Sequence, residues 1–258
     1  MDMKTDLSGR VAIITGSSSG VGAATARLLG GMGCRIVINY AHSEEPAKVV
    51  AAECEALGAE VLICRADVSD DKDCKNLVNE VMNTWGKIDI LINYAGTTKF
   101  VEHKNLAGLD KEDFLNIYGV NVIGPFQMVR AAESALRKSS AGSIVNVASI
   151  AGVRGVGSSI AYAASKGALL TMTQSLARVM GPEVRVNAIC PGFIQGEWLK
   201  KGIGTDNYER IRSSYENAAP LNLTCTAEDV AESIVAFAVG HGVTTGQYLI
   251  LDGGHYLT

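Results

Sequence analysis

The sequence predicts an α/β protein built on one doubly wound parallel sheet of about seven strands, with helices on both faces. Two observations lead to this fold class. Short apolar runs alternate with longer amphipathic segments along the 258-residue chain. The apolar runs are continuous rather than alternately polar, which is typical of strands that helices cover on both faces.

The predicted elements follow one another in this alternating order. Apolar runs mark seven strands, at Val11–Thr15, Arg35–Asn39, Glu60–Arg65, Ile88–Asn93, Gly142–Ala148, Arg185–Cys190 and Tyr248–Leu251. Helical patterns lie between the earlier strands, at about 21–33, 44–57, 70–85, 111–138 and 162–180. A last helix begins with Thr226 as its cap, because Glu228 and Asp229 follow in its first turn.

One domain spans residues 1–258, because no Pro/Ser-rich linker, internal repeat or low-complexity tract divides the chain. Its least regular part runs from Gly192 to Leu223 and is rich in Gly, Asn and charged residues. This part follows a strand end, where the loops of parallel sheets line a ligand crevice. We therefore expect a mobile substrate-side loop at 192–223, with a plain surface excursion as the alternative.

The composition argues against several kinds of partner. A net charge of −4 and a pI near 5.6 give no support for a nucleic-acid or anionic-membrane surface. No stretch of about 20 apolar residues predicts a membrane span, and the polar Met1–Arg10 lacks a signal-peptide run. The six cysteines form no C-x-x-C pair and do not cluster with the four histidines, so we expect no metal site. Unpaired thiols suit a reducing cytoplasm.

A glycine-rich turn joins the first strand to the first helix. It reads T-G-S-S-S-G-V-G at 15–22 and places glycines at Gly16, Gly20 and Gly22. Glycines at this point let backbone N–H groups and the helix N-terminus approach a pyrophosphate. The pattern predicts a nucleotide site, although a tight turn alone would also need glycine.

The end of the second strand bears on which nucleotide binds. A carboxylate there would bind the ribose diol of NAD and repel a 2′-phosphate, but the chain has none until Glu44. Ser43 is a candidate donor to a 2′-phosphate, and His42 a candidate for positive charge, with a solvated loop residue as its alternative. We therefore expect NADP(H) as the preferred cofactor, with NAD(H) left open.

Two further strand ends carry residues that suit a nucleotide. Asp67, before Val68, is placed to accept from an adenine amino group or to cap the next helix. The fourth strand ends in N-Y-A-G at 93–96, where small residues leave room for a cofactor across the sheet edge.

Tyr162 and Lys166 lie four residues apart, so they share one face of a predicted helix. An ammonium close to a phenol lowers the phenol pKa from its usual value of about 10. A phenol adjusted in this way exchanges a proton near neutral pH. We therefore expect a lowered pKa for Tyr162.

These pieces together resemble the short-chain dehydrogenase/reductase family, in particular its 3-oxoacyl-[acyl-carrier-protein] reductases. The resemblance runs from Gly9 to Gly254 and rests on the order of its motifs. They are T-G-S-S-S-G-V-G at 15–22, A-D-V at 66–68, N-Y-A-G at 93–96, Asn121 in V-N-V-I-G, Ser149 in N-V-A-S, Y-A-A-S-K at 162–166, P-G at 191–192 and L-D-G-G at 251–254.

The resemblance implies a Rossmann-like NAD(P)-binding domain with a catalytic tetrad of Asn121, Ser149, Tyr162 and Lys166. Tyr162 would protonate the carbonyl oxygen, and Ser149 would hydrogen-bond it. Lys166 would support Tyr162 electrostatically and bind the nicotinamide ribose. Asn121 would hold a water that connects Lys166 to solvent protons. We expect cofactor contacts from Gly16, Ser18, Ser19, Gly20, Val21, Tyr40, His42, Ser43, Asp67, Val68, Asn93, Ala95, Gly96, Tyr162, Lys166, Pro191, Gly192 and Ile194.

Three positions depart from the family pattern. Tyr94 replaces the second Asn of N-N-A-G, where it would stack near the nicotinamide or pack against a neighbour. Gly196 stands where a threonine usually contacts the carboxamide, which leaves backbone groups or Gln195 for that contact. Ser19 replaces a basic residue frequent in NADP-dependent members.

We therefore expect an NADP(H)-dependent oxidoreductase that interconverts a ketone and a secondary alcohol, with an acyl thioester as one candidate substrate. The alternatives are an NAD-dependent dehydrogenase of a sugar, steroid or cyclic alcohol, and a non-catalytic nucleotide-sensing regulator. Apolar residues on more than one face of the helices at 111–138 and 162–180, such as Phe126, Met128 and Leu170, suggest a second buried side. The resemblance implies a homotetramer built on these helices and the C-terminal strand.

Overall fold

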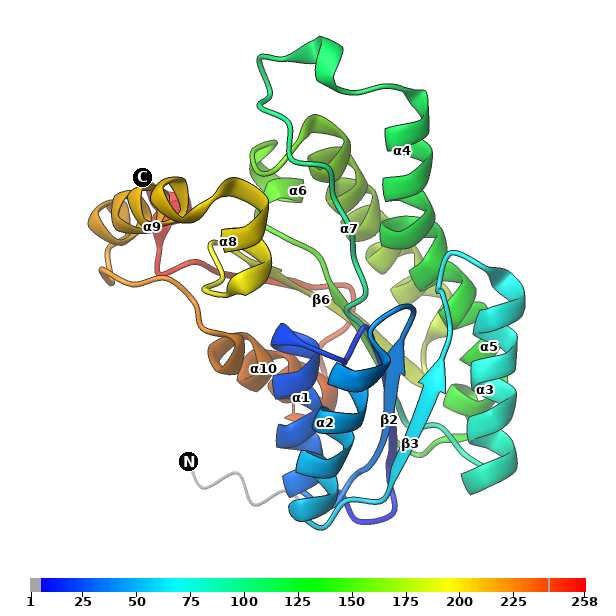
Figure 1. Ribbon diagram of the computed structural model, residues 1–258. Coiled ribbons are helices and arrows are strands. Elements are labelled where there is room, and N and C mark those ends of the chain that lie inside the picture. The colour runs from blue at the N-terminus through cyan, green and yellow to red at the C-terminus, as the bar shows by residue number, and fades with distance from the viewer. Residues whose placement is uncertain (1–5, 241) are drawn as a thin grey trace.

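The chain folds around one parallel sheet of seven strands in the order β3-β2-β1-β4-β5-β6-β7 (Figure 1). A computed structural model describes residues 6–240 and 242–258. The strands are β1 (Val11–Thr15), β2 (Arg35–Tyr40), β3 (Val61–Arg65), β4 (Ile90–Asn93), β5 (Gly142–Val147), β6 (Val184–Pro191) and β7 (Tyr248–Leu251). The predicted α/β class is confirmed.

Helices connect the strands and begin at residues that suit a cap. They are α1 (Gly20–Gly31), α2 (Glu44–Ala56), α3 (Asp71–Trp85), α4 (Lys111–Tyr118), α5 (Gly124–Lys138), α6 (Ala151–Arg154), α7 (Ile160–Met180), α8 (Glu197–Ile203), α9 (Thr205–Ala218) and α10 (Ala227–Val235). Thr226 caps α10 as predicted, since its hydroxyl accepts from the Asp229 N–H at 3.1 Å. No helix within the described residues is both long and apolar enough to cross a membrane.

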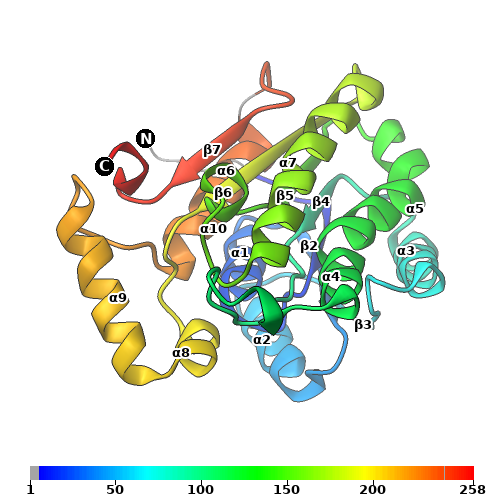
Figure 2. The same cartoon turned by 90° about the horizontal axis from the view of Figure 1, so that it is seen from above.

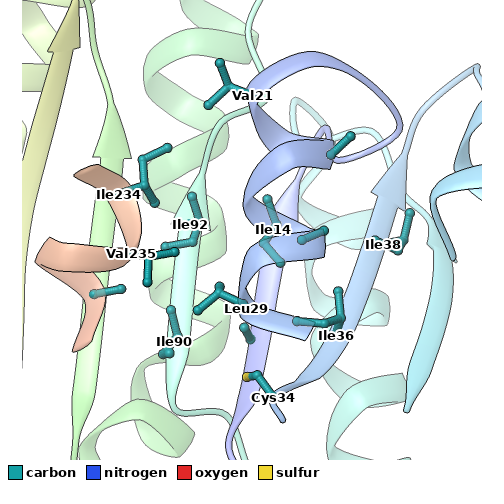
Figure 3. Close-up of a cluster of buried hydrophobic side chains, with 14 of the residues drawn as sticks. Ile14, Val21, Leu29, Cys34, Ile36, Ile38, Ile90, Ile92, Ile234 and Val235 are labelled. Carbon is teal, nitrogen blue, oxygen red and sulfur yellow. The ribbon is translucent and has the colours of Figure 1, made fainter. Parts of the chain in front are cut away.

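Helices cover the sheet on both faces, which explains the continuous apolar strands (Figure 2). One face packs against α1, α2 and α10, with Ile14, Ile36, Leu29 and Ile234 among the fully buried residues (Figure 3). The other face packs against α3, α5 and α7. The sheet is therefore fixed between two apolar layers, which hold the ends of its strands in place.

The strand order reverses between β1 and β4, each of which pairs with the other in parallel. The chain leads from β1 outward to β2 and β3, and then crosses back to β4. Loops that follow neighbouring strands at such a switch point diverge to opposite faces of the sheet, which opens a crevice at the carboxyl ends of the strands.

Two predicted elements differ in the structure. The single helix expected at 111–138 is interrupted at Gly119–Ile123 by a π-helical segment. Pro125 accounts for this locally, because it has no N–H to give the carbonyl of Asn121 the ordinary α-helical bond. The segment expected as an irregular loop at 192–223 instead contains α8 and α9. Only Tyr208 is buried in α9, so its apolar pattern is too weak to predict a helix.

Candidate active site

A cavity of about 1250 Å³ opens at the carboxyl ends of the strands. It runs from the glycine-rich turn after β1, past the ends of β4 and β5, to α8 and α9. Ligand pockets usually measure about 300–1000 Å³, so this cavity has room for a dinucleotide and a second molecule.

The glycines of the turn are required by close contacts. Gly16 and Gly20 have φ of +68° and +57°, which disfavour any side chain. A Cβ on Gly16 would lie 2.9 Å from the Ala95 Cα, and one on Gly22 would lie 2.6 Å from the Tyr94 Cδ1. The N-cap residue Ser19 makes no side-chain cap bond, and the first turn of α1 carries no acidic residue. The positive end of α1 is thus available to an anionic pyrophosphate, and the cradle fits the predicted nucleotide.

Buried polar side chains hold this turn in position. Asn39 accepts from the Gly16 N–H at 3.0 Å and donates to the carbonyl of Ala66 at 3.0 Å. Thr15 accepts from the N–H groups of Tyr94 and Ala95, each at 3.1 Å. The two side chains tie β1 to the ends of β2, β3 and β4. Their roles depend on strand neighbours, so the sequence alone did not predict them.

Most of the predicted cofactor contacts line the cavity. They are Gly16, Ser19, Gly20, Val21, His42, Asp67, Val68, Ala95, Gly96, Tyr162, Lys166, Pro191, Gly192 and Ile194. Asp67 does not cap α3, because its carboxylate accepts from Ser69 and the cap is Asp70. The Asp67 side chain therefore stays at the wall of the cavity, where an adenine contact was expected.

Four of the predicted cofactor contacts do not line the cavity: Ser18, Tyr40, Ser43 and Asn93. The Tyr40 side chain packs in the apolar core beside α2, since alternate residues of a strand point to opposite faces. Asn93 is buried and donates to the Oδ1 of Asn146 at 2.9 Å, which joins β4 to β5. The side chains of Tyr40 and Asn93 therefore pack inside the protein rather than at the cavity.

Tyr162 and Ser149 meet at the wall of the cavity. Ser159 caps α7 by accepting from the Tyr162 N–H at 3.2 Å, which places Tyr162 in the first turn of that helix. Ser149 follows β5, and its Oγ accepts from the Ala151 N–H at 3.1 Å. The Ser149 side chain also hydrogen-bonds the Tyr162 phenol. The two hydroxyls predicted to face a carbonyl oxygen are thus neighbours.

Lys166 lies beneath Tyr162 and is almost fully buried, with 4% of its surface exposed. Its Nζ donates to the Val147 carbonyl at 2.8 Å and lies 5.7 Å from the centre of the Tyr162 ring. Burial lowers the pKa of Lys166 to about 8. The ammonium therefore loses its proton within an accessible pH range.

The expected lowering of the Tyr162 pKa is wrong for the protein alone. Burial raises the pKa of Tyr162 to about 12, and the hydrogen bond from Ser149 lowers it by less. The Lys166 Nζ approaches the ring of Tyr162 and hydrogen-bonds Val147, so desolvation outweighs its favourable charge. A phenol with a raised pKa stays protonated at neutral pH, as a proton donor must.

Asn121 lies in the π-helical segment and is 1% exposed. Its Oδ1 accepts from the Thr97 N–H at 2.8 Å, and its Nδ2 donates to the Thr97 carbonyl and to the Ser165 Oγ, both at 3.0 Å. Gly96 separates Asn121 from Lys166, since a Cβ there would lie 3.5 Å from the Asn121 Oδ1 and 3.6 Å from the Lys166 Nζ. The structure therefore brings Asn121 close to Lys166, although only Ser149, Tyr162 and Lys166 of the four predicted catalytic residues line the cavity.

The departures from the family pattern have local explanations. Tyr94 packs against Gly20 and Gly22 of the turn. Gly196 has φ of +157° and open space around the position of a Cβ. Gln195 donates to the Thr224 Oγ1 at 3.1 Å, so the side chain that was to replace the missing threonine is already bonded.

Part of the cavity wall is apolar. Phe100 and Trp198 contact each other with ring centres 5.4 Å apart, and both line the cavity together with Leu115 and Val156. Arg154, at the end of α6, donates to the His255 carbonyl at 3.1 Å, so its guanidinium is already engaged. This wall suits an apolar molecule better than an anion.

Comparison with known proteins agrees with this geometry. The family described as Enoyl-(Acyl carrier protein) reductase matches residues 16–256. A Streptomyces violaceoruber protein assigned as ketoacyl reductase 2 of granaticin polyketide synthase is 42% identical over 96% of each chain. The 3-oxoacyl-[acyl-carrier-protein] reductase of Synechocystis is 32% identical, over 97% of this chain and 98% of its own. The crystal structure of an NAD⁺-bound xylitol dehydrogenase superposes with a TM-score of 0.88 at 26% identity, covering 97% of this chain and 100% of that one.

The chain therefore belongs to the short-chain dehydrogenase/reductase family, and it is similar to the 3-oxoacyl-[acyl-carrier-protein] reductases. It is an NAD(P)-dependent oxidoreductase that acts on ketone and alcohol groups.

Proposed function

We propose that the enzyme reduces an apolar ketone or a 3-oxoacyl thioester to the secondary alcohol, with NADP(H) as its preferred cofactor. The observation that carries this proposal is the shared cavity. Tyr162, Ser149 and Lys166 border the same space as the glycine-rich turn after β1. A cofactor on the glycine-rich turn and a ketone beside Tyr162 can therefore occupy the same cavity.

The catalytic roles follow from the chemistry of the four residues. A bound nicotinamide supplies the hydride. Tyr162 donates a proton to the carbonyl oxygen as negative charge builds on it, and Ser149 hydrogen-bonds the same oxygen. Lys166 stabilises the phenolate that forms when Tyr162 has donated its proton. Asn121 positions the backbone of Thr97 beside them through its two side-chain bonds at 2.8 and 3.0 Å.

A cation that lies outside the second strand supports the preference for NADP(H). No carboxylate occupies positions 39–43 at the end of β2. Arg65, which pairs with Tyr40 in the sheet, donates from its Nε to the Ala41 carbonyl at 3.3 Å. Arg65 is exposed and bonds the residue that precedes His42, which supports a positive charge near the end of β2 for the 2′-phosphate of NADP(H).

The apolar wall supports the substrate class. Phe100 and Leu115 have no hydrogen-bonding side-chain group for the hydroxyls of a sugar, and Trp198 has only its indole N–H. Lys201 also lines the cavity and is the candidate contact for an acidic carrier at its entrance. The similarity to ketoacyl reductases points to the same class.

A second candidate is an NAD-dependent dehydrogenase of a sugar alcohol. It is favoured by the high structural similarity to an NAD⁺-bound xylitol dehydrogenase. In that case the alcohol proton would pass to Tyr162 rather than from it.

We also propose a homotetramer, although fewer of the expected apolar residues support it than the sequence suggested. Met128 is fully buried inside the chain, and Leu170 is half-buried. Phe126 of α5 remains 44% exposed, and Val179 of α7 is also exposed. These exposed apolar side chains support a contact with a second copy. The six free, buried cysteines support a cytoplasmic location.

The test is a steady-state screen of ketones and alcohols with NADPH, NADH and their oxidised forms. We expect the highest kcat/KM for an apolar ketone or 3-oxoacyl thioester with NADPH. A tenfold or greater preference for NADH would contradict the proposed cofactor, and a best substrate among the sugar alcohols would favour the second candidate.

A further inference from the structure

The least expected residue of the cavity is Tyr94, which follows β4. Its ring packs across the glycine-rich turn, because a Cβ on Gly22 would lie 2.6 Å from its Cδ1. A Cβ on Gly20 would lie 2.9 Å from its hydroxyl oxygen. The ring therefore fills the space that these glycines leave open and brings its hydroxyl to the N-terminus of α1.

The Tyr94 hydroxyl is placed to accept one hydrogen bond and to donate another. Burial raises its pKa, and the backbone N–H of Val21, in the first turn of α1, lowers it by hydrogen bonding. The phenol therefore stays protonated at neutral pH and accepts from Val21. Among the described residues, no hydrogen bond uses the Tyr94 hydroxyl proton, and the side chain lines the cavity. That proton is free for a ligand.

An anion at this point would meet two donors of different origin. The Val21 N–H belongs to the helix terminus, where a pyrophosphate is expected to bind. The Tyr94 hydroxyl adds a side-chain O–H beside it. A hydroxyl that bonds an anionic oxygen forms a charge-assisted bond, which is about twice as strong as a neutral one.

We propose that Tyr94 is a cofactor-binding residue whose hydroxyl donates to the dinucleotide pyrophosphate at the N-terminus of α1. This inference rests on the proposed function, since it assumes that a dinucleotide occupies the turn. Both NADP(H) and NAD(H) carry the pyrophosphate, so the contact strengthens the binding of both cofactors and does not change the preference between them.

The test is Tyr94→Phe, which keeps the ring against Gly22 and removes only the hydroxyl. We expect the Kd values of NADPH, NADH and ADP-ribose, measured by calorimetry, to rise by about tenfold each. Adenosine, which has no phosphate, should bind as it does to the unchanged protein. Tyr248→Phe removes a hydroxyl from the half-exposed β7 and serves as the matched control, with no change for any ligand.

Three results would overturn the inference. Unchanged Kd values for ADP-ribose would show that the hydroxyl does not reach the pyrophosphate. A loss confined to NADPH and NADH would place the hydroxyl at the nicotinamide instead. Tighter binding by Tyr94→Phe would show that the hydroxyl obstructs the turn. Failure of the proposed function is distinguishable, because the unchanged protein would then bind none of the dinucleotides.

Discussion

The Lys166 Nζ lies 5.7 Å from the centre of the Tyr162 ring. The two side chains are one helical turn apart on α7, where Lys166 is almost fully buried and Tyr162 is partly buried. Burial acts on them in opposite senses, because it raises the pKa of an acid that becomes charged and lowers that of a base. Tyr162 therefore holds its proton to about pH 12, while Lys166 begins to lose its proton near pH 8.

This difference predicts the pH dependence of ketone reduction. Lys166 is protonated below about pH 8 and neutral above it, whereas Tyr162 remains a proton donor throughout this range. The neutral amine cannot stabilise the Tyr162 phenolate, so we expect kcat/KM for reduction to be level from pH 6 to 7 and to fall above about pH 8. Stopped-flow measurement of the reduction rate checks this. A rate that stays level to pH 10 would exclude Lys166 as the controlling group.

The glycine-rich turn predicts a contrast between two positions on α1. In Gly22→Ala the new Cβ would meet Tyr94 at 2.6 Å and the Gly16 carbonyl at 2.9 Å. We expect a loss of about 1–3 kcal/mol in the free energy of unfolding, with weaker dinucleotide binding. Gly31→Ala is the control, because its Cβ would meet only Leu57, at 4.0 Å, and alanine favours a helix. Urea denaturation should show a gain of up to about 1 kcal/mol there. Equal effects at both positions would contradict the close fit.

The sequence predicts those parts of the molecule that depend on local pattern. Continuous apolar runs locate the strands, and the motifs select Ser149, Tyr162 and Lys166, which line one cavity. The parts that depend on tertiary contacts are missed. Arg65 reaches Ala41 only because β2 and β3 pair in a register that sets Tyr40 beside it. The raised pKa of Tyr162 depends in the same way on burial that no spacing of residues reveals.

The charge of Arg65 leads us to predict that its removal weakens the binding of one cofactor only. We expect Arg65→Gln to weaken NADPH binding by about tenfold and to leave NADH binding within about twofold, because only NADPH carries the 2′-phosphate. The difference should shrink at high ionic strength, since the guanidinium is exposed. Fluorescence titration with both cofactors measures it. Arg178→Gln, at an exposed site on α7, is the control, and an equal loss for both cofactors at Arg65 would rule out a phosphate contact.

The contact between Phe100 and Trp198 predicts that a change there affects substrate binding but not cofactor binding. Removing the indole in Trp198→Ala takes away an apolar surface and its aromatic contact at 5.4 Å. We expect the KM for an apolar ketone to rise by about five- to tenfold, with the Kd of NADPH unchanged. Leu106→Ala, at a side chain 72% exposed, is the control. A change in Kd without a change in KM would place Trp198 at the cofactor instead.

The central claim is that Tyr162 transfers the proton, and Tyr162→Phe tests it most directly because it removes one oxygen and keeps the ring above Lys166. Turnover of the best ketone and the Kd of NADPH should be measured on the same preparation. We predict a fall in kcat of about 10²- to 10⁴-fold, with the Kd of NADPH within about twofold of the unchanged enzyme. Unchanged turnover would contradict the mechanism, and an unchanged enzyme that binds NADPH but turns over no ketone or alcohol would instead indicate a nucleotide sensor.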